Sequence, residues 1–223
     1  MSALKAADQH VLRLIYQLPF RKTLFIRFLI FIGDGPAWML VLLLLAMIGW
    51  GFNQMLIFTT ANLMMLGLTI GNFSFVPFKK HVPRRRPYAN PELQQRLGIT
   101  IVNRDPDHGS KERESFPSGH VTWTTICVTI LCAQLGTPAI FLLAWLIPAM
   151  VLLRPYLGVH YPSDVIGGLV LGGLVATVTM LFDESVAELS QMIYQAGWPV
   201  RLAYWLFIAG FLLVGFKSWL KRV

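Results

Sequence analysis

Charged residues are scarce in this chain of 223 residues: they make up 13% of it, whereas hydrophobic residues make up 55%. A soluble domain normally carries about 25% charged residues. The shortage argues against an ordinary soluble globular protein. It indicates an all-α integral membrane protein, built as one helical bundle.

Cysteine and acidic residues are also few. The only two cysteines, Cys127 and Cys132, lie in one apolar segment at a spacing that places them on different faces of a helix, so we expect no disulfide between them. The N-terminus lacks a short apolar run followed by small residues, so we expect no cleavable signal peptide. With 11 acidic and 19 basic residues the net charge is +8. The basic residues flank apolar stretches or crowd one loop, which favours lipid headgroups and phosphates as partners rather than nucleic acid.

Six apolar stretches approach the ~17 to 25 residues that a membrane span requires. They are Ala37–Gly51, Met55–Phe73, Val121–Leu135, Ala139–Leu153, Val165–Phe182 and Val200–Phe216. Residues 1–33 alternate apolar and polar side chains at helical spacing and predict an N-terminal interfacial helix. We therefore expect a six-span bundle forming a single domain, residues 1–223. In the fifth stretch Gly167, Gly168, Gly172 and Gly173 favour close helix packing.

The distribution of basic residues bears on orientation. With six spans, every lysine and arginine except Arg201 falls on one side of the membrane. The positive-inside rule places that side in the cytoplasm. An anion-binding site would collect cations on either side, which weakens this argument, but the remaining basic residues still favour the cytoplasmic side.

Three polar blocks lie at the ends of apolar stretches on that same side. They are Lys79-Lys80-His81-Val82-Pro83-Arg84-Arg85-Arg86-Pro87, then Pro117-Ser118-Gly119-His120, then the stretch from Arg154 to Asp164. Arginines can fork onto phosphate oxygens, and Lys79 adds a mobile charge. Pro117 and Ser118 predict a helix start, with the serine oxygen as a cap and the free amides as an anion site. Together the blocks indicate a phosphate site.

His160 and Asp164 suggest the chemistry. Pro162 and Ser163 predict the start of the fifth helix, with Asp164 in its first turn. Its carboxylate would accept a proton from one nitrogen of His160 and leave the other nitrogen free to attack. His120, from a separate segment, suits the role of leaving-group acid.

These blocks resemble the type 2 phosphatidic acid phosphatase family, membrane lipid phosphatases related to vanadium haloperoxidases and bacterial acid phosphatases. The resemblance covers residues 55–182 and rests on Lys-(six)-Arg-Pro, Pro-Ser-Gly-His and Arg-(five)-His-(three)-Asp in the family's order. It implies that His160 attacks phosphorus to form a phosphohistidine, assisted by Asp164, and that His120 protonates the leaving oxygen and then activates water. It assigns the phosphate oxygens to Lys79, Arg86, Ser118, Gly119 and Arg154, and it implies no metal and no other cofactor.

The chain departs from the family pattern in two places. Leu153 stands where the family usually has serine, which removes a hydroxyl expected at the site. Residues 200–216 form an extra C-terminal span, whereas many relatives have a span before the interfacial helix.

A bacterial inner membrane is the expected location of the protein. The charge distribution favours a cytoplasmic site, and family habit favours a periplasmic one.

The sequence predicts a lipid phosphatase acting on a phosphate monoester or diphosphate such as undecaprenyl diphosphate, phosphatidylglycerol phosphate, phosphatidic acid or a lipid A phosphate. Two alternatives remain: a lipid phosphotransferase using the same site, and a non-enzymatic lipid-binding or transport bundle. No protein partner is implied. Arg84 and Arg85 are interpreted as headgroup anchors. Residues 88–114 have little apolar content and are interpreted either as a lid over the site or as a plain connecting loop.

Overall fold

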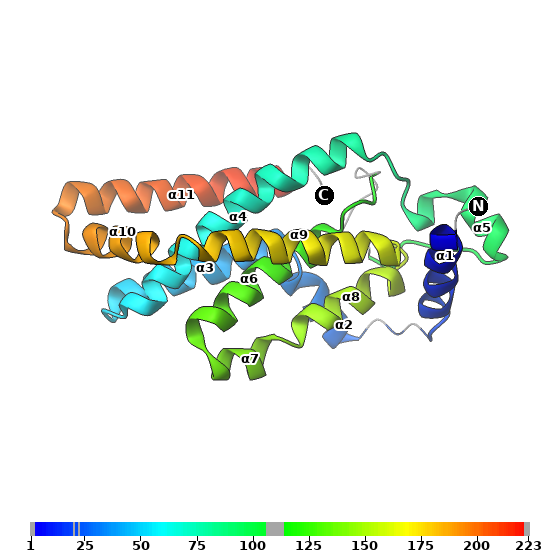
Figure 1. Cartoon of the computed structure of the whole chain (residues 1–223), viewed down its shortest axis with the longest axis horizontal. Coiled ribbons are helices and arrows are strands. Elements are labelled where there is room, and N and C mark those ends of the chain that lie inside the picture. The colour runs from blue at the N-terminus through cyan, green and yellow to red at the C-terminus, as the bar shows by residue number, and fades with distance from the viewer. Residues whose placement is uncertain (1–2, 20, 22, 106–113, 221–223) are drawn as a thin grey trace.

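The computed structural model describes residues 3–19, 21, 23–105 and 114–220. Within these ranges the regular elements are helices, apart from an isolated antiparallel bridge between Arg85 and Glu114. They are α1 (Ala3–Tyr16), α2 (Leu24–Ile32), α3 (Gly35–Gly51), α4 (Met55–His81), the 3-10 helix η1 (Pro87–Ala89), α5 (Pro91–Leu97), α6 (Gly119–Leu135), α7 (Thr137–Leu143), α8 (Leu146–Tyr156), α9 (Pro162–Met180), α10 (Asp183–Gln195) and α11 (Trp198–Leu220). The all-α class is confirmed. The helices α4, α9 and α11 follow the long axis of the molecule, and α1 and α5 lie at one end of it (Figure 1).

Each of the six apolar stretches falls on a helix or a pair of helices. Four segments are long and apolar enough to cross a membrane: Met55–His81, Thr137–Tyr156, Pro162–Met180 and Trp198–Lys217. A fifth is the pair α2 and α3, if the two are counted as one span in spite of a bend of 72° between them. The remaining stretch forms α6, an apolar helix of 17 residues. The described helices thus supply four spans, or five with the bent pair.

The helices α6 and α9 approach each other closely because glycines line their contact. A Cβ on Gly168 would lie 2.7 Å from the Ser118 carbonyl oxygen, and one on Gly172 would lie 2.8 Å from that of Thr122. Gly167 packs in the same way against the Phe116 ring. The predicted helix packing is confirmed for Gly168 and Gly172, whereas Gly167 packs on Phe116 in the segment before α6 and Gly173 has open space beside it. This close approach brings the start of α9 against the start of α6.

The N-terminal segment contains two separate helices. In α1, Leu12 and Tyr16 are buried against Leu93, Ile101 and Tyr161. At these two positions the apolar side chains of α1 therefore pack against other parts of the protein. This packing also involves α5 and the segment after it, contrary to the expectation that residues 88–114 contain little that packs. Residues 106–113 of that loop lie outside the described part of the chain.

Candidate active site

The three polar blocks come together at one end of the bundle. Lys79 lies in the last turn of α4, which runs eight residues beyond the predicted Phe73. The last turn of α4 contains Lys79, Lys80 and His81. Positive charges there are stabilised by the negative end of the helix dipole. The remaining members are Arg86 before η1, Ser118 and His120 at the start of α6, Arg154 near the end of α8, and His160 and Asp164 around the start of α9. All six of these side chains are buried.

The first turns of α6 and α9 were predicted correctly in position, but their capping differs. Ser118 is the N-cap residue of α6, yet its side chain makes no capping hydrogen bond. Its amide donates to the Asp164 carbonyl oxygen at 3.0 Å, which ties the two helix starts together. The Ser118 Oγ is buried and has no hydrogen-bond partner among the described residues. An unpaired buried hydroxyl is costly, so this oxygen suits an external ligand better than a structural role.

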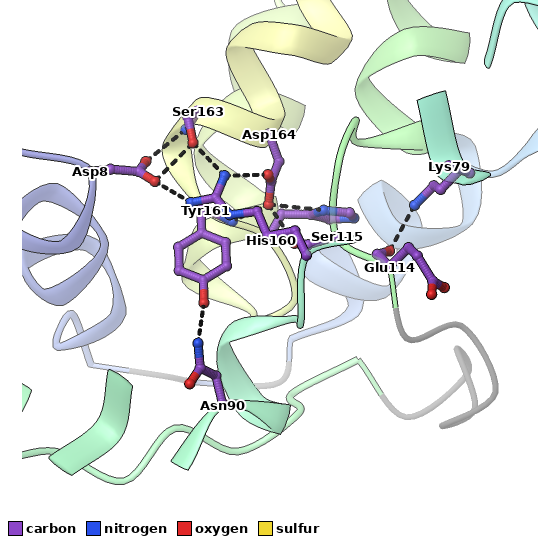
Figure 2. A network of polar contacts seen from close by, with 10 residues as sticks. Asp8, Lys79, Asn90, Glu114, Ser115, His160, Tyr161, Ser163 and Asp164 are labelled. Atoms are coloured by element: carbon purple, nitrogen blue, oxygen red, sulfur yellow. Dashed lines mark hydrogen bonds and ion pairs between the residues drawn. The ribbon is translucent and has the colours of Figure 1, made fainter. Parts of the chain in front are cut away.

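His160 and Asp164 lie together as predicted. The His160 Nδ1 is 3.7 Å from the Asp164 Oδ2, which is an ion-pair distance and longer than a hydrogen bond. Catalytic hydrogen bonds are often long before substrate binds. The Asp164 Oδ2 instead accepts from the Tyr161 amide at 2.8 Å and from the Ser115 hydroxyl. These donors hold the carboxylate beside the imidazole (Figure 2).

Arg84 is the residue that the sequence interpretation placed wrongly. Its Nη1 donates to the Ser163 Oγ and to the Asp164 Oδ1, both at 2.6 Å, and its guanidinium lies over the Tyr161 ring at 3.7 Å. It is therefore an internal partner of Asp164 and not a headgroup anchor. Arg85, in contrast, is exposed. No spacing rule distinguished these adjacent arginines.

Asp8 of α1 closes this network. The Arg84 Nη2 donates to the Asp8 Oδ2 at 2.5 Å, and the Asp8 carboxylate accepts from both the amide and the hydroxyl of Ser163 at 2.8 Å. In Figure 2 Asp8 reaches across from its own helix to the first turn of α9. Two carboxylates thus share one arginine, and α1 is fixed to the segment that carries Asp164.

The proposed phosphate-binding cations are held by partners from the loop after α4. The Arg154 Nη1 donates to the Asp105 Oδ2 at 2.8 Å, and both side chains are almost fully buried. The Lys79 ammonium donates to the Glu114 carbonyl oxygen at 2.8 Å. The Arg154 Nε has no hydrogen-bond partner among the described residues. Arg154 is therefore oriented by Asp105, and its Nε can still donate a hydrogen bond to a phosphate oxygen.

Leu153, which stands at the position of the family serine, lies in the main hydrophobic core. The same core contains Leu157 and Val165. Among the described residues no group of three or more histidine, cysteine, aspartate or glutamate side chains is arranged to hold a metal ion.

The surroundings of His160 set its protonation. Burial lowers the pKa of His160 well below its ordinary value, and the positive charges of Arg86, Arg154 and Lys79 lower it further, while a contact with the Ser115 backbone acts the other way. A neutral imidazole is the form that can attack phosphorus. The cations near His160 thus favour its neutral form, and their charge also favours the binding of an anion.

This depression predicts the pH dependence of kcat/KM. Protonation of His160 will appear as an acidic limb below about pH 6.5, the ordinary histidine pKa, because the neutral form persists down to the lowered pKa. In Arg86→Gln the limb will move up towards 6.5, because Arg86 lowers the pKa of His160 more than Arg154 or Lys79 does. Steady-state rates between pH 4.5 and 9 measure both. An acidic limb at 6.5 or above in the wild type, unmoved in the variant, would contradict the assignment.

Comparison with known proteins identifies the family of this chain. A family model described as the PAP2 superfamily matches residues 55–186. Decaprenylphosphoryl-5-phosphoribose phosphatase of Mycolicibacterium smegmatis is 38% identical over 102 residues, which are 46% of this chain and 48% of that protein. The protein of the same name from Mycobacterium tuberculosis H37Rv is 45% identical over 64 residues, which are 29% of this chain and 34% of that protein. The aligned regions thus span half or less of the length of these curated relatives.

Two solved structures share the fold. LpxE of Aquifex aeolicus superposes with a TM-score of 0.62 at 18% identity, covering 77% of this chain and 93% of that one. A transmembrane PAP2 type phosphatidylglycerolphosphate phosphatase from Bacillus subtilis superposes with a TM-score of 0.63 at 22% identity, covering 83% and 88%. At these identities the likeness concerns the fold alone. The family match, which covers more than half of the chain and contains all three polar blocks, shows that this protein belongs to the PAP2 superfamily.

Proposed function

We propose that the protein is a membrane lipid phosphatase that hydrolyses a lipid phosphate monoester or diphosphate through a phosphohistidine on His160. The observation that carries this proposal is the pairing of His160 with Asp164 beside three cations, with His120 starting the neighbouring helix. Apolar helices continue directly from this end of the bundle. The arrangement suits a substrate whose phosphate enters the site while its tail stays in lipid.

In the proposed reaction the His160 Nε2 attacks phosphorus and the bond to the leaving oxygen breaks. Asp164 stabilises the positive charge that develops on the imidazole through Nδ1. Lys79, Arg86 and Arg154, with Ser118 and the Gly119 amide, hold the three remaining phosphate oxygens. His120 gives its proton to the leaving oxygen. It then takes one from water, which attacks phosphorus, releases phosphate and restores His160.

Charge neutralisation by three cationic side chains makes this a metal-independent mechanism. We further propose a single domain, residues 1–223, embedded in a bacterial inner membrane with α6 as a sixth span. In this arrangement α1 lies at the membrane surface on the side of the active site.

The names of the sequence relatives suggest the first substrate to test. Decaprenylphosphoryl-5-phosphoribose carries a phosphate monoester on a sugar attached to a polyprenyl lipid, and its phosphatases share 38% to 45% identity with this chain over the matched regions. Phosphatidylglycerol phosphate, undecaprenyl diphosphate, phosphatidic acid and lipid A phosphates complete the panel.

The test is phosphate release by the detergent-purified protein in EDTA across this panel. We expect release from at least one lipid, unchanged by the chelator, and a fall of about four orders of magnitude or more in His160→Ala, as for other essential nucleophiles. The His160→Ala protein, purified in parallel, controls for contaminating phosphatases. No release from any lipid would contradict the proposal. A phosphorylated lipid product in place of free phosphate would assign the site to phosphotransfer.

A further inference from the structure

Asp34 is a carboxylate in an unusual place. It is the only acidic residue between Asp8 and Glu92, and it interrupts the apolar run that forms α2 and α3. The two helices bend by 72° at this break, and Asp34 is the N-cap residue of α3, accepting from the Gly35 amide at 3.2 Å. An acidic side chain in such a segment is costly and usually serves a function with an identifiable partner.

The partner in this structure is His120. The Asp34 Oδ1 lies 3.9 Å from the His120 Nε2, and the two side chains are 17% and 8% exposed. The break itself packs against the same ring, because a Cβ on Gly33 would lie 3.0 Å from the His120 Cδ2. Met150 of α8 also contacts this glycine position. The bend between α2 and α3 therefore places a carboxylate beside the proposed general acid.

We infer that Asp34 is a positioning residue for His120 and favours its protonated form, an inference that rests on the proposed phosphatase function. A neighbouring carboxylate stabilises an imidazolium and holds the nitrogen that faces it. With the Nε2 proton held towards Asp34, the Nδ1 proton passes to the leaving oxygen, and the neutral ring then accepts a proton from water at Nδ1. Each catalytic histidine thus has its own carboxylate: Asp164 faces the Nδ1 of His160, and Asp34 faces the Nε2 of His120.

Two other roles for Asp34 must be separated from this one. It caps α3, and its charge also acts on Arg154. Asp34→Asn keeps the cap, because asparagine caps helices as well as aspartate does, and removes the charge. An effect through Arg154 would change the affinity for phosphate. An effect through His120 would depend on how much protonation the leaving group needs.

The experiment compares kcat/KM for substrates with poor and good leaving groups. For an alkyl phosphate lipid we expect Asp34→Asn to lower kcat/KM about 10- to 100-fold, part of the 10²–10⁴ that general acid catalysis contributes. For 4-nitrophenyl phosphate, whose leaving group needs no proton, we expect a change of less than about threefold. The inhibition constant of inorganic phosphate should stay unchanged. In a His120→Ala background Asp34→Asn should have no further effect on the alkyl substrate.

Three results would overturn the inference. One is an equal loss for both substrates. Another is a changed inhibition constant of phosphate with the leaving-group dependence unchanged, which would assign the effect of Asp34 to Arg154. The third is a wild-type protein inactive on every substrate, which would remove the proposed function and this inference with it. Asp34→Ser, which also keeps a capping oxygen, is the second variant if Asp34→Asn does not fold.

Discussion

Phosphate will remain covalently attached to the protein when His120→Ala is given an aryl phosphate. The nitrophenolate leaves without a proton, so His160 can still be phosphorylated, whereas the water that should release the phosphate has lost its base. We expect turnover to fall by about 10²–10⁴, the usual contribution of a general acid or base. Radiolabelled phosphate should accumulate on the chain in a bond that acid breaks and alkali leaves intact, as for a phosphorus–nitrogen bond.

The double variant His120→Ala/His160→Ala is the matched control and should carry no label. Labelling of the double variant would place the covalent phosphate on another residue. An acid-stable label would indicate an ester of serine or tyrosine. Either result would contradict the assignment of His160 as the nucleophile.

Arg84→Ala will disable the site although Arg84 is assigned no contact with the substrate. The substitution leaves Asp164, which is fully buried, and Asp8 close together without the guanidinium that they share. Leaving a buried carboxylate without its ion-pair partner costs about 3 kcal/mol, and the 28% exposure of the Arg84 side chain lowers this cost because water reaches the site. The carboxylate that orients His160 also loses a donor, so we expect kcat to fall by roughly 10²-fold or more, an effect as large as that of a lost oxyanion-hole donor.

Arg85→Ala is the control, because it removes the same charge from the next, exposed position. We expect it to change kcat and thermal stability little. Asp8→Asn should weaken the attachment of α1 and lower kcat less than Arg84→Ala does, because the contact between Arg84 and Asp164 survives. Equal effects of Arg84→Ala and Arg85→Ala would mean that both act only through general electrostatics. Phosphate release and thermal unfolding in detergent measure the two quantities.

The sequence predicted the parts of this protein that depend on local pattern. Hydrophobic runs located the helices, because a membrane span must be continuous and apolar. The turn residues before His120 and Asp164 located the starts of α6 and α9 to within a residue or two, because proline and small polar residues have few other uses there. These local features are what bring the two proposed catalytic histidines to the same end of the bundle.

Partners from distant segments were missed, since their contacts depend on tertiary structure. Asp8 and Arg84 meet across 76 residues, and Arg154 and Asp105 across 49. Nothing in the immediate neighbourhood of Arg84 separates it from Arg85 until the position of α1 is known. Asp34 did leave a signal, a lone carboxylate in an apolar run, which general membrane energetics mark as unusual. Such an isolated charge is visible in the sequence alone.

The attachment of α1 to α9 has a consequence for how the protein is made. Asp8 and Ser163 are separated by 155 residues. At a synthesis rate of about 5–20 residues per second, α1 leaves the ribosome roughly eight to thirty seconds before its binding site exists. Throughout that interval Asp164 has not yet been synthesised, so the pair of His160 and Asp164 is incomplete. We therefore expect a partly inserted chain to lack the proposed activity towards the lipids that surround it until the first turn of α9 is in place.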